Sequence, residues 1–171
     1  VAFYRVATLV ASFVVIILQV SNTVVSPYIS RLHAQNDMSG IETLVGRSNT
    51  LIILATIPLV LGIVVASPWL LATFYGADFS AAYLPLLFLT AGQAVNALLG
   101  TVAPLLNMTG HQRDVTRAMT VALALNILLH LLLLPRFGLE GAAFSSMMML
   151  VTWNLILWFR VKQRLRIRYY V

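Results

Sequence analysis

Five long apolar segments dominate this sequence. They lie at about residues 4–29, 48–73, 82–106, 116–134 and 140–159. Each reaches or exceeds the roughly 20 residues that an α-helix needs to cross about 30 Å of hydrocarbon. Only 9% of the 171 residues are charged, whereas a soluble domain carries roughly 25%. This number of charges is too small to cover a surface that faces water. We therefore predict an all-α, polytopic membrane bundle of about five transmembrane helices.

Polar, turn-rich stretches separate these segments. They occupy residues 31–40, 75–78, 107–114 and 135–145. In the last stretch, Pro135 is expected to end one helix, and Gly138 and Gly141 are expected to allow a sharp reversal. Arg136 and Glu140 would then lie at the level of the lipid headgroups. The stretch is therefore predicted to be the tip of a helical hairpin.

The basic residues are divided unevenly between the two ends of the predicted bundle. Arg5 and Arg136 fall at one end. The other nine of the eleven fall at the opposite end, and they are Arg31, Arg47, Arg113, Arg117, Arg160, Lys162, Arg164, Arg166 and Arg168. Because cytoplasmic loops are enriched in Lys and Arg, this end and the basic tail from about residue 160 are predicted to be cytoplasmic.

Uncharged polar residues recur at helical spacing inside four of the spans. In hydrocarbon such side chains cost free energy, so they should face protein or a water-filled cavity. The first interpretation is a hydrated cavity between helices, and the alternative is that these residues hold neighbouring helices together. Because four spans carry such a stripe, we favour the cavity. Its predicted lining consists of Arg5, Gln19, Asn22, Gln93, Asn96, Asn126 and His130.

Prolines and titratable groups add further expectations. Pro58, Pro85 and Pro104 are expected to kink their spans. His130 is either a proton relay or a hydrogen-bonded packing residue, and the second role is favoured. No buried carboxylate for cation coupling is expected, because all five acids fall in loops or at span ends, namely Asp37, Glu42, Asp78, Asp114 and Glu140.

Signatures of enzymatic chemistry are missing from the sequence. There is no cysteine, and therefore no disulfide or thiolate metal site. No paired carboxylates, metal-ligand cluster, Gly-rich phosphate loop or Ser–His–Asp arrangement is apparent. The bases follow apolar runs and lack groove-reading elements, which argues against nucleic-acid binding. We therefore expect no enzyme, no metal, no cofactor and no nucleic-acid partner.

Several short motifs occur in an order that resembles a known family. They are SPYISRL at residues 26–32 followed by Asn36 and Asp37, FYGADF at 74–79, NMTGH at 107–111, Asn126, and FGLEGAA at 137–143. Together they span nearly the whole chain. Their order resembles the C-terminal half of polysaccharide flippases, which translocate O-antigen and capsule repeat units. These flippases belong to the multidrug/oligosaccharidyl-lipid/polysaccharide exporter superfamily.

The resemblance implies a protein of about twelve helices in two lobes around a central cavity. Residues 1–171 would form a single transmembrane domain, the C-terminal lobe of this longer protein. The function implied is flipping of an undecaprenyl-diphosphate-linked oligosaccharide by alternating access, in the bacterial inner membrane, during O-antigen or other surface polysaccharide biosynthesis. Lipopolysaccharide biosynthesis is one such pathway.

The partners implied are the lipid-linked oligosaccharide, membrane lipids, the missing N-terminal lobe and polysaccharide assembly proteins. Two alternatives stay open at this point. One is a multidrug/cation antiporter of the same fold. The other is an integral-membrane enzyme or scaffold of envelope glycan assembly.

Overall fold

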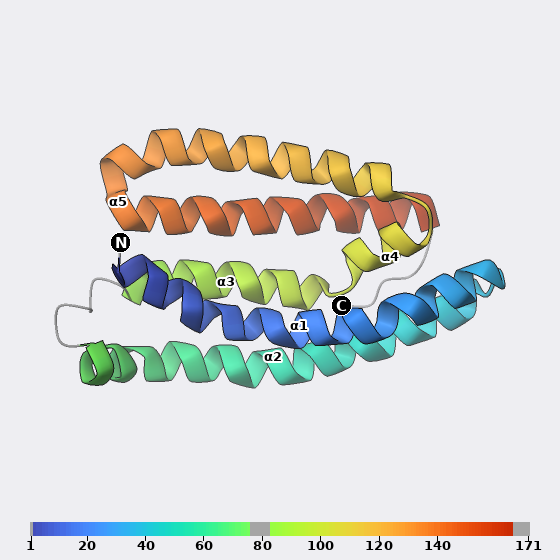
Figure 1. Cartoon of the computed structure of the whole chain (residues 1–171), viewed down its shortest axis with the longest axis horizontal. Coiled ribbons are helices and arrows are strands. Elements are labelled where there is room, and N and C mark those ends of the chain that lie inside the picture. The colour runs from blue at the N-terminus through green and yellow to red at the C-terminus, as the bar shows by residue number, and fades with distance from the viewer. Residues whose placement is uncertain (1, 76–82, 166–171) are drawn as a thin grey trace.

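The protein is a bundle of long helices (Figure 1). The computed structural model describes residues 2–75 and 83–165, without the side chains of residues 2–7, 10, 68 and 70–75. Every regular element within these residues is a helix, which confirms the predicted all-α membrane bundle. The helices are α1 (Ala2–Ala34), α2 (Met38–Tyr75), α3 (Tyr83–Leu99), α4 (Val102–Met108) and α5 (Gln112–Leu165).

The outside of the bundle is apolar. Three helical stretches are long and apolar enough to cross a membrane on their own, namely Ala11–Ala34, Met38–Ser67 and Gln112–Leu165, and α3 with α4 qualifies as a fourth, bent span. Large aliphatic side chains point outward along them, with Val65 77%, Leu131 70% and Leu51 69% exposed. Because water would oppose such exposure and lipid does not, the protein is a multi-pass membrane protein.

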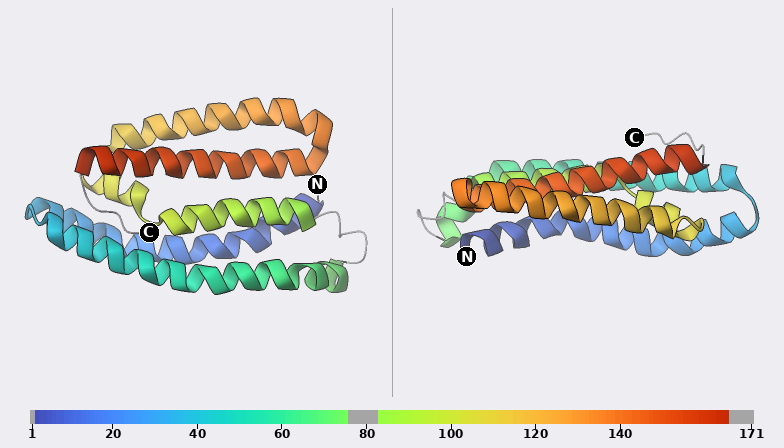
Figure 2. Two further views of the ribbon diagram at one scale, coloured as in Figure 1. Left: turned by 180° about the vertical axis from the view of Figure 1, so that it is seen from behind. Right: turned by 90° about the horizontal axis from the view of Figure 1, so that it is seen from above.

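Helix α5 is a hairpin of two limbs. At Gly138 the backbone leaves the helical region, with φ 53° and ψ −127°. Glycine adopts this conformation at little cost because it has no Cβ. The chain reverses there, so that residues 112–137 and 139–165 lie side by side (Figures 1 and 2). The predicted hairpin tip is therefore confirmed.

Pro135 does not end the first limb, contrary to the sequence-based expectation. It lies inside the helix, and the reversal comes after it. Proline lacks one backbone N–H and so removes one helical hydrogen bond. Its ring nevertheless holds φ near the helical value, and a helix can continue past it. The backbone conformation that turns the chain is available to glycine, which is why the break occurs at Gly138.

Small residues let the second limb of α5 approach its neighbours closely. A Cβ added to Gly141 would lie 2.6 Å from the carbonyl oxygen of Leu133 on the first limb. On the other side, a Cβ added to Gly92 of α3 would lie 3.1 Å from the Cα of Met147. In lipid, helices associate largely through such close packing, since burial of apolar surface gives little driving force there.

The predicted span at residues 82–106 is broken into α3 and α4. Gly100 adopts a positive φ of 62°, and the two helices meet at an angle of 45°. The expected kinks at Pro85 and Pro104 do not account for this bend. Both prolines stand in the first turn of their helices, where no backbone N–H is needed. The bend therefore lies at the glycine.

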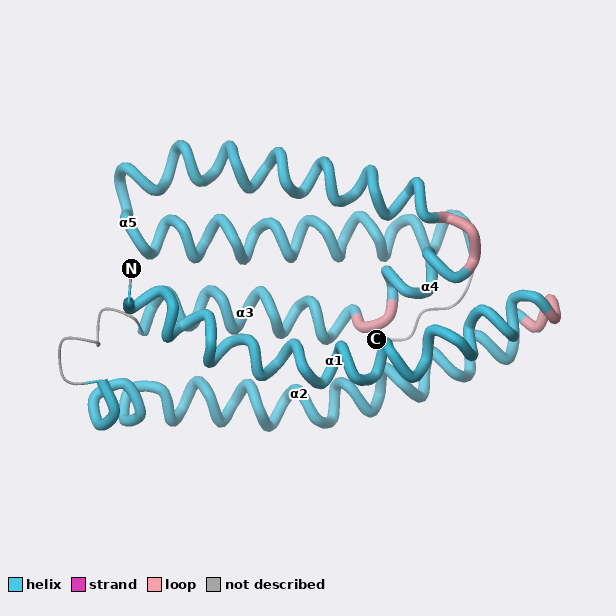
Figure 3. Tube along the Cα trace, viewed as in Figure 1, coloured by secondary structure: helices cyan, strands magenta, loops and turns pink. Residues whose placement is uncertain are grey.

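Apart from the break between α3 and α4, the ends of the described helices lie at the two ends of the bundle (Figure 3). The turns at residues 35–37 and 109–111 lie at the same end as the last turn of α5. This end carries Arg31, Arg113, Arg117 and Arg164, and we call it the base-rich end. The reversal at Gly138 lies at the opposite end. The grouping of bases expected from the sequence is thus present among the described residues, whereas Arg166 and Arg168 lie outside them.

We expect Gly141→Leu to separate the two limbs of α5, because its side chain would collide with the backbone at Leu133. The thermal midpoint of the detergent-solubilised protein should fall sharply, as overpacking typically costs about 1–3 kcal/mol. Gly62→Leu is the matched control, since a Cβ at Gly62 meets nothing within 4 Å. Equal midpoints for the two variants would contradict the proposed close approach.

Candidate functional site

Three amide side chains meet in the bundle interior between α3 and the second limb of α5. Asn154 donates its Nδ2 hydrogen to Oδ1 of Asn96 at 3.0 Å. Asn96 in turn donates from Nδ2 to Oε1 of Gln93 at 3.3 Å. Asn154 is 1% exposed and also donates to the carbonyl oxygen of Leu150 at 2.9 Å. We call Gln93, Asn96 and Asn154 the amide cluster.

The amide cluster borders a cleft between α3 and the two limbs of α5. The cleft has a volume of about 500 Å³. Asn96 and Thr116 supply polar groups, Trp153 supplies an aromatic face, and the remaining lining is aliphatic or thioether, from Val115, Met119, Met149 and Leu150. An uncharged cleft of this kind suits a ligand that has both hydroxyl groups and apolar faces.

The break between α3 and α4 lies close to the amide cluster in sequence and is packed against α2. Asn49 of α2 is 1% exposed, and its Nδ2 lies 3.5 Å from the carbonyl oxygen of Leu98. Any Cβ at Gly100 would overlap Oδ1 of Asn49. The glycine therefore serves two purposes here, because it permits the positive φ and leaves room for the asparagine side chain.

None of the hydrogen bonds of the amide cluster involves a predicted lining residue of α1. Gln19 is exposed. Asn22 is half-buried, and among the described residues its buried Oδ1 finds no hydrogen-bond partner. Arg5 belongs to α1, but its side chain is outside the described part of the structure. Their role as cavity lining stays a prediction.

Asn126 and His130 lie on the first limb of α5, at the edge of the bundle (Figure 1). Both are half-buried. Nδ1 of His130 lies 3.1 Å from the backbone carbonyl oxygen of Asn126, so this contact stays within one helix. Of the predicted lining residues, the structure thus brings together Gln93 and Asn96, while the others are distributed over α1 and the edge limb.

Two buried asparagines were not among the predicted lining residues. Asn154 follows Thr152 and Trp153 in the last span. An amide next to another polar residue inside an apolar segment could have indicated it as a candidate. Asn49 stands in the polar start of a span, after Arg47 and Ser48, where it resembles an ordinary loop-proximal residue. Sequence periodicity assigns a residue to a helix face, but it does not specify which helix that face meets.

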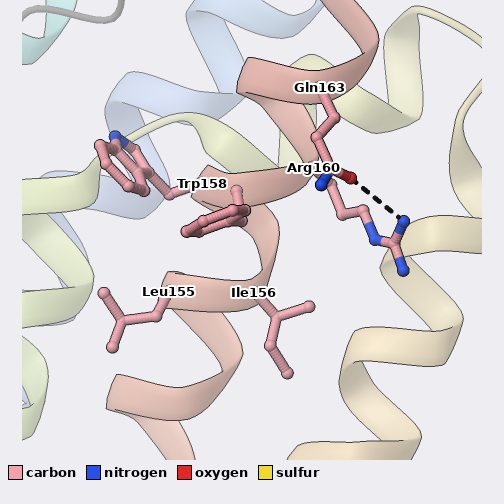
Figure 4. Close-up of a pocket in the computed structure, with 6 residues that line it drawn as sticks. Leu155, Ile156, Trp158, Arg160 and Gln163 are labelled. Atoms are coloured by element: carbon pink, nitrogen blue, oxygen red, sulfur yellow. Dashed lines mark hydrogen bonds between the residues drawn. The ribbon is translucent and has the colours of Figure 1, made fainter.

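A second groove runs along the outer face of α5 near the base-rich end (Figure 4). It has a volume of about 480 Å³, and Leu155, Ile156, Trp158 and Phe159 form its apolar part. At its polar edge, Nη1 of Arg160 donates to Oε1 of Gln163 at 3.3 Å (Figure 4). Aromatic side chains beside bases are typical of the membrane–water interface. We therefore assign this groove to the lipid boundary.

The amide cluster and the cleft beside it can bind a ligand through uncharged hydrogen bonds. No group of three or more His, Asp or Glu that could hold a metal ion occurs within residues 2–75 and 83–165. The amide cluster offers donors and acceptors without charge. Such groups can hold hydroxyl groups in place.

The amide cluster should contribute measurably to stability. We expect Asn96→Ala and Asn154→Ala to be coupled, because each removes a partner of the 3.0 Å hydrogen bond. A double-mutant cycle on the thermal or denaturant unfolding of the protein should give a coupling energy of about 0.6 kcal/mol, the average for hydrogen bonds between membrane helices, and at most about 1.7 kcal/mol. Additive effects would mean that the contact does not form in the membrane protein in solution.

Comparison with known proteins gives one informative relative. The chain is 27% identical over 146 residues to a protein named "Probable low-salt glycan biosynthesis flippase Agl15" from Haloferax volcanii. The match covers 84% of this chain and 30% of the relative, so the chain spans less than a third of that protein's length. No protein-family model and no solved structure matches. The chain is thus similar to part of a flippase, a transporter by name, in agreement with the expectation that it is no enzyme.

Proposed function

We propose that this chain is one lobe of a membrane flippase that translocates a lipid-linked oligosaccharide in glycan biosynthesis. The observation that carries the proposal is the similarity to a glycan biosynthesis flippase over 84% of the chain. The fold is compatible with it, because several long apolar helices enclose an uncharged polar cluster. The activity requires the remainder of the protein, since the matched region is 30% of the relative.

The cleft beside the amide cluster has suitable chemistry for a sugar. Asn96 can donate to and accept from hydroxyl groups. Trp153 lines the same cleft and offers a flat apolar surface for the faces of a pyranose ring. The absence of charged residues from its lining fits neutral cargo better than ionic cargo. We propose that the sugar head group passes this cleft.

We also propose a lipid carrier and a direction of transport. The oligosaccharide would be linked to a prenyl diphosphate and would move from the cytoplasmic to the outer leaflet of a bacterial inner membrane. Its prenyl tail would stay in lipid while two lobes rock about the polar cavity. The break at Gly100 supports this mechanism, because broken helices line the sites of many transporters.

The antiporter alternative is less favoured. Cation coupling by such a protein needs a carboxylate within the membrane. Asp114 is the buried carboxylate among the described residues, and it stands at the base-rich end in contact with Arg164 at 3.0 Å. A paired acid at the end of the bundle is poorly placed to couple cation entry to transport.

We expect Asn96→Leu in the full-length gene product to reduce glycan export about tenfold, the effect of losing one hydrogen bond to the cargo. Asn154→Leu should also reduce export, because it removes the 3.0 Å hydrogen bond that positions Asn96. Export is measured as surface glycan in a flippase-deficient strain. Thr120→Val is the matched control, because Thr120 is exposed and its hydroxyl bonds within its own helix to Thr116. Normal export by both asparagine variants, at equal protein levels, would refute the cleft as the sugar path.

The orientation can be tested with single cysteines, since the chain contains none. In intact cells, a membrane-impermeant maleimide should label Arg136→Cys near the hairpin tip. It should label Gln35→Cys in the first turn only after permeabilisation, because the base-rich end is proposed to be cytoplasmic. The opposite pattern would place the C-terminus outside.

A further inference from the structure

A polar cavity lies at the base-rich end, where the two limbs of α5 come together. It has a volume of about 390 Å³. Its charged walls come from the start of the first limb and the end of the second, with His111 on the adjoining turn. The ionisable residues that line it are His111, Arg113, Asp114, Arg117 and Arg164.

One buried carboxylate organises the cavity. Asp114 is 4% exposed and accepts a hydrogen bond from Nε of Arg164 at 3.0 Å. Its other oxygen lies 3.9 Å from Nη1 of Arg117. The contact with Arg164 uses the Nε hydrogen and leaves both Nη groups to face another acceptor. Asp114 therefore holds two guanidinium groups next to each other, although like charges would otherwise separate.

The cavity has a surplus of positive charge. Three arginines and a single carboxylate line it, which leaves two formal positive charges before His111 is counted. The side chains of Arg117 and Arg164 are 71% and 49% exposed, so both remain accessible. On the adjoining turn, Oγ1 of the buried Thr109 lies 3.2 Å from Nδ1 of His111 and restrains the ring.

We propose that this cavity binds a phosphate group of a membrane lipid at the interface. Guanidinium groups bind phosphate through paired, charge-assisted hydrogen bonds. The surplus of two charges matches a phosphate better than a neutral headgroup. The cavity is at the level where headgroups lie, because it is at the end of the apolar limbs. The phosphate belongs either to an anionic phospholipid or to a prenyl diphosphate, and the proposal does not depend on the cargo proposed above.

A plain orientation signal is the competing explanation for these bases. Positive charges at a cytoplasmic end act through their number and side, and their exact positions matter little. Arg47 provides the comparison that separates the two ideas. It is exposed, lies at the same end, and is outside the cavity. Neutralising it removes the same charge without altering the cavity.

The test is binding of short-chain lipids to the purified full-length gene product in a neutral detergent. The probes are dioctanoyl phosphatidylglycerol, dioctanoyl phosphatidylcholine and farnesyl diphosphate, with affinity measured by native mass spectrometry or calorimetry. We expect the wild-type protein to prefer at least one anionic probe over phosphatidylcholine. Arg117→Gln and Arg113→Gln should each lower the affinity for that probe about tenfold, as expected for the loss of a charge-assisted hydrogen bond. Arg47→Gln should leave this affinity nearly unchanged.

Each outcome decides the proposal. Loss of affinity in the cavity variants alone supports the site, and the tighter of the two anionic probes identifies the source of the phosphate. Equal losses in Arg47→Gln and Arg117→Gln would overturn it in favour of general surface charge, as would the absence of any preference for anionic lipid. Arg113 and Arg117 are exposed, so both variants should fold, and an unchanged thermal midpoint confirms this. Export activity plays no part in the measurement, so a failed flippase proposal leaves the result valid.

Discussion

Hydrocarbon cannot form a hydrogen bond with a backbone N–H or C=O group, and this constraint governs the architecture. Each apolar segment must satisfy its backbone internally, so each becomes a helix. Two departures from the helix among the described residues show how the chain meets this constraint. Gly138 turns the chain at one end of the bundle. At Gly100, inside a span, Asn49 brings an amide group to the carbonyl of Leu98.

The same solvent explains how the helices are held together. Burial of leucine against leucine gains little when lipid is the alternative, so close packing and interhelical hydrogen bonds provide the specificity. Gly92 and Gly141 allow the second limb of α5 to approach its neighbours on both sides. The bond from Asn154 to Asn96 crosses one of these close interfaces. Packing and a polar site are therefore joined at the same place.

Charge has a different task at the base-rich end. Most of its bases are exposed and can set orientation by number alone. Asp114 is different, because a buried carboxylate is costly unless it is paired. It is paired with Arg164 across the two limbs. This ion pair joins the two limbs at the cavity that the basic residues line. The positions of the bases, as well as their number, then have chemical meaning.

Sequence alone determined that lipid surrounds the protein, that the fold is all-α, where the hairpin tip lies and how the bases are grouped. These features depend on local hydropathy and on the backbone freedom of glycine. The sequence also marked Gln93 and Asn96 as one polar face. Tertiary structure decided which faces meet. It joined Asn96 to Asn154 across 58 positions and Asp114 to Arg164 across 50, and it left Gln19 on the outside. Periodicity of about 3.6 residues fixes the direction of a side chain relative to its own helix axis, whereas the rotation of one helix against another depends on the fit of all their side chains together.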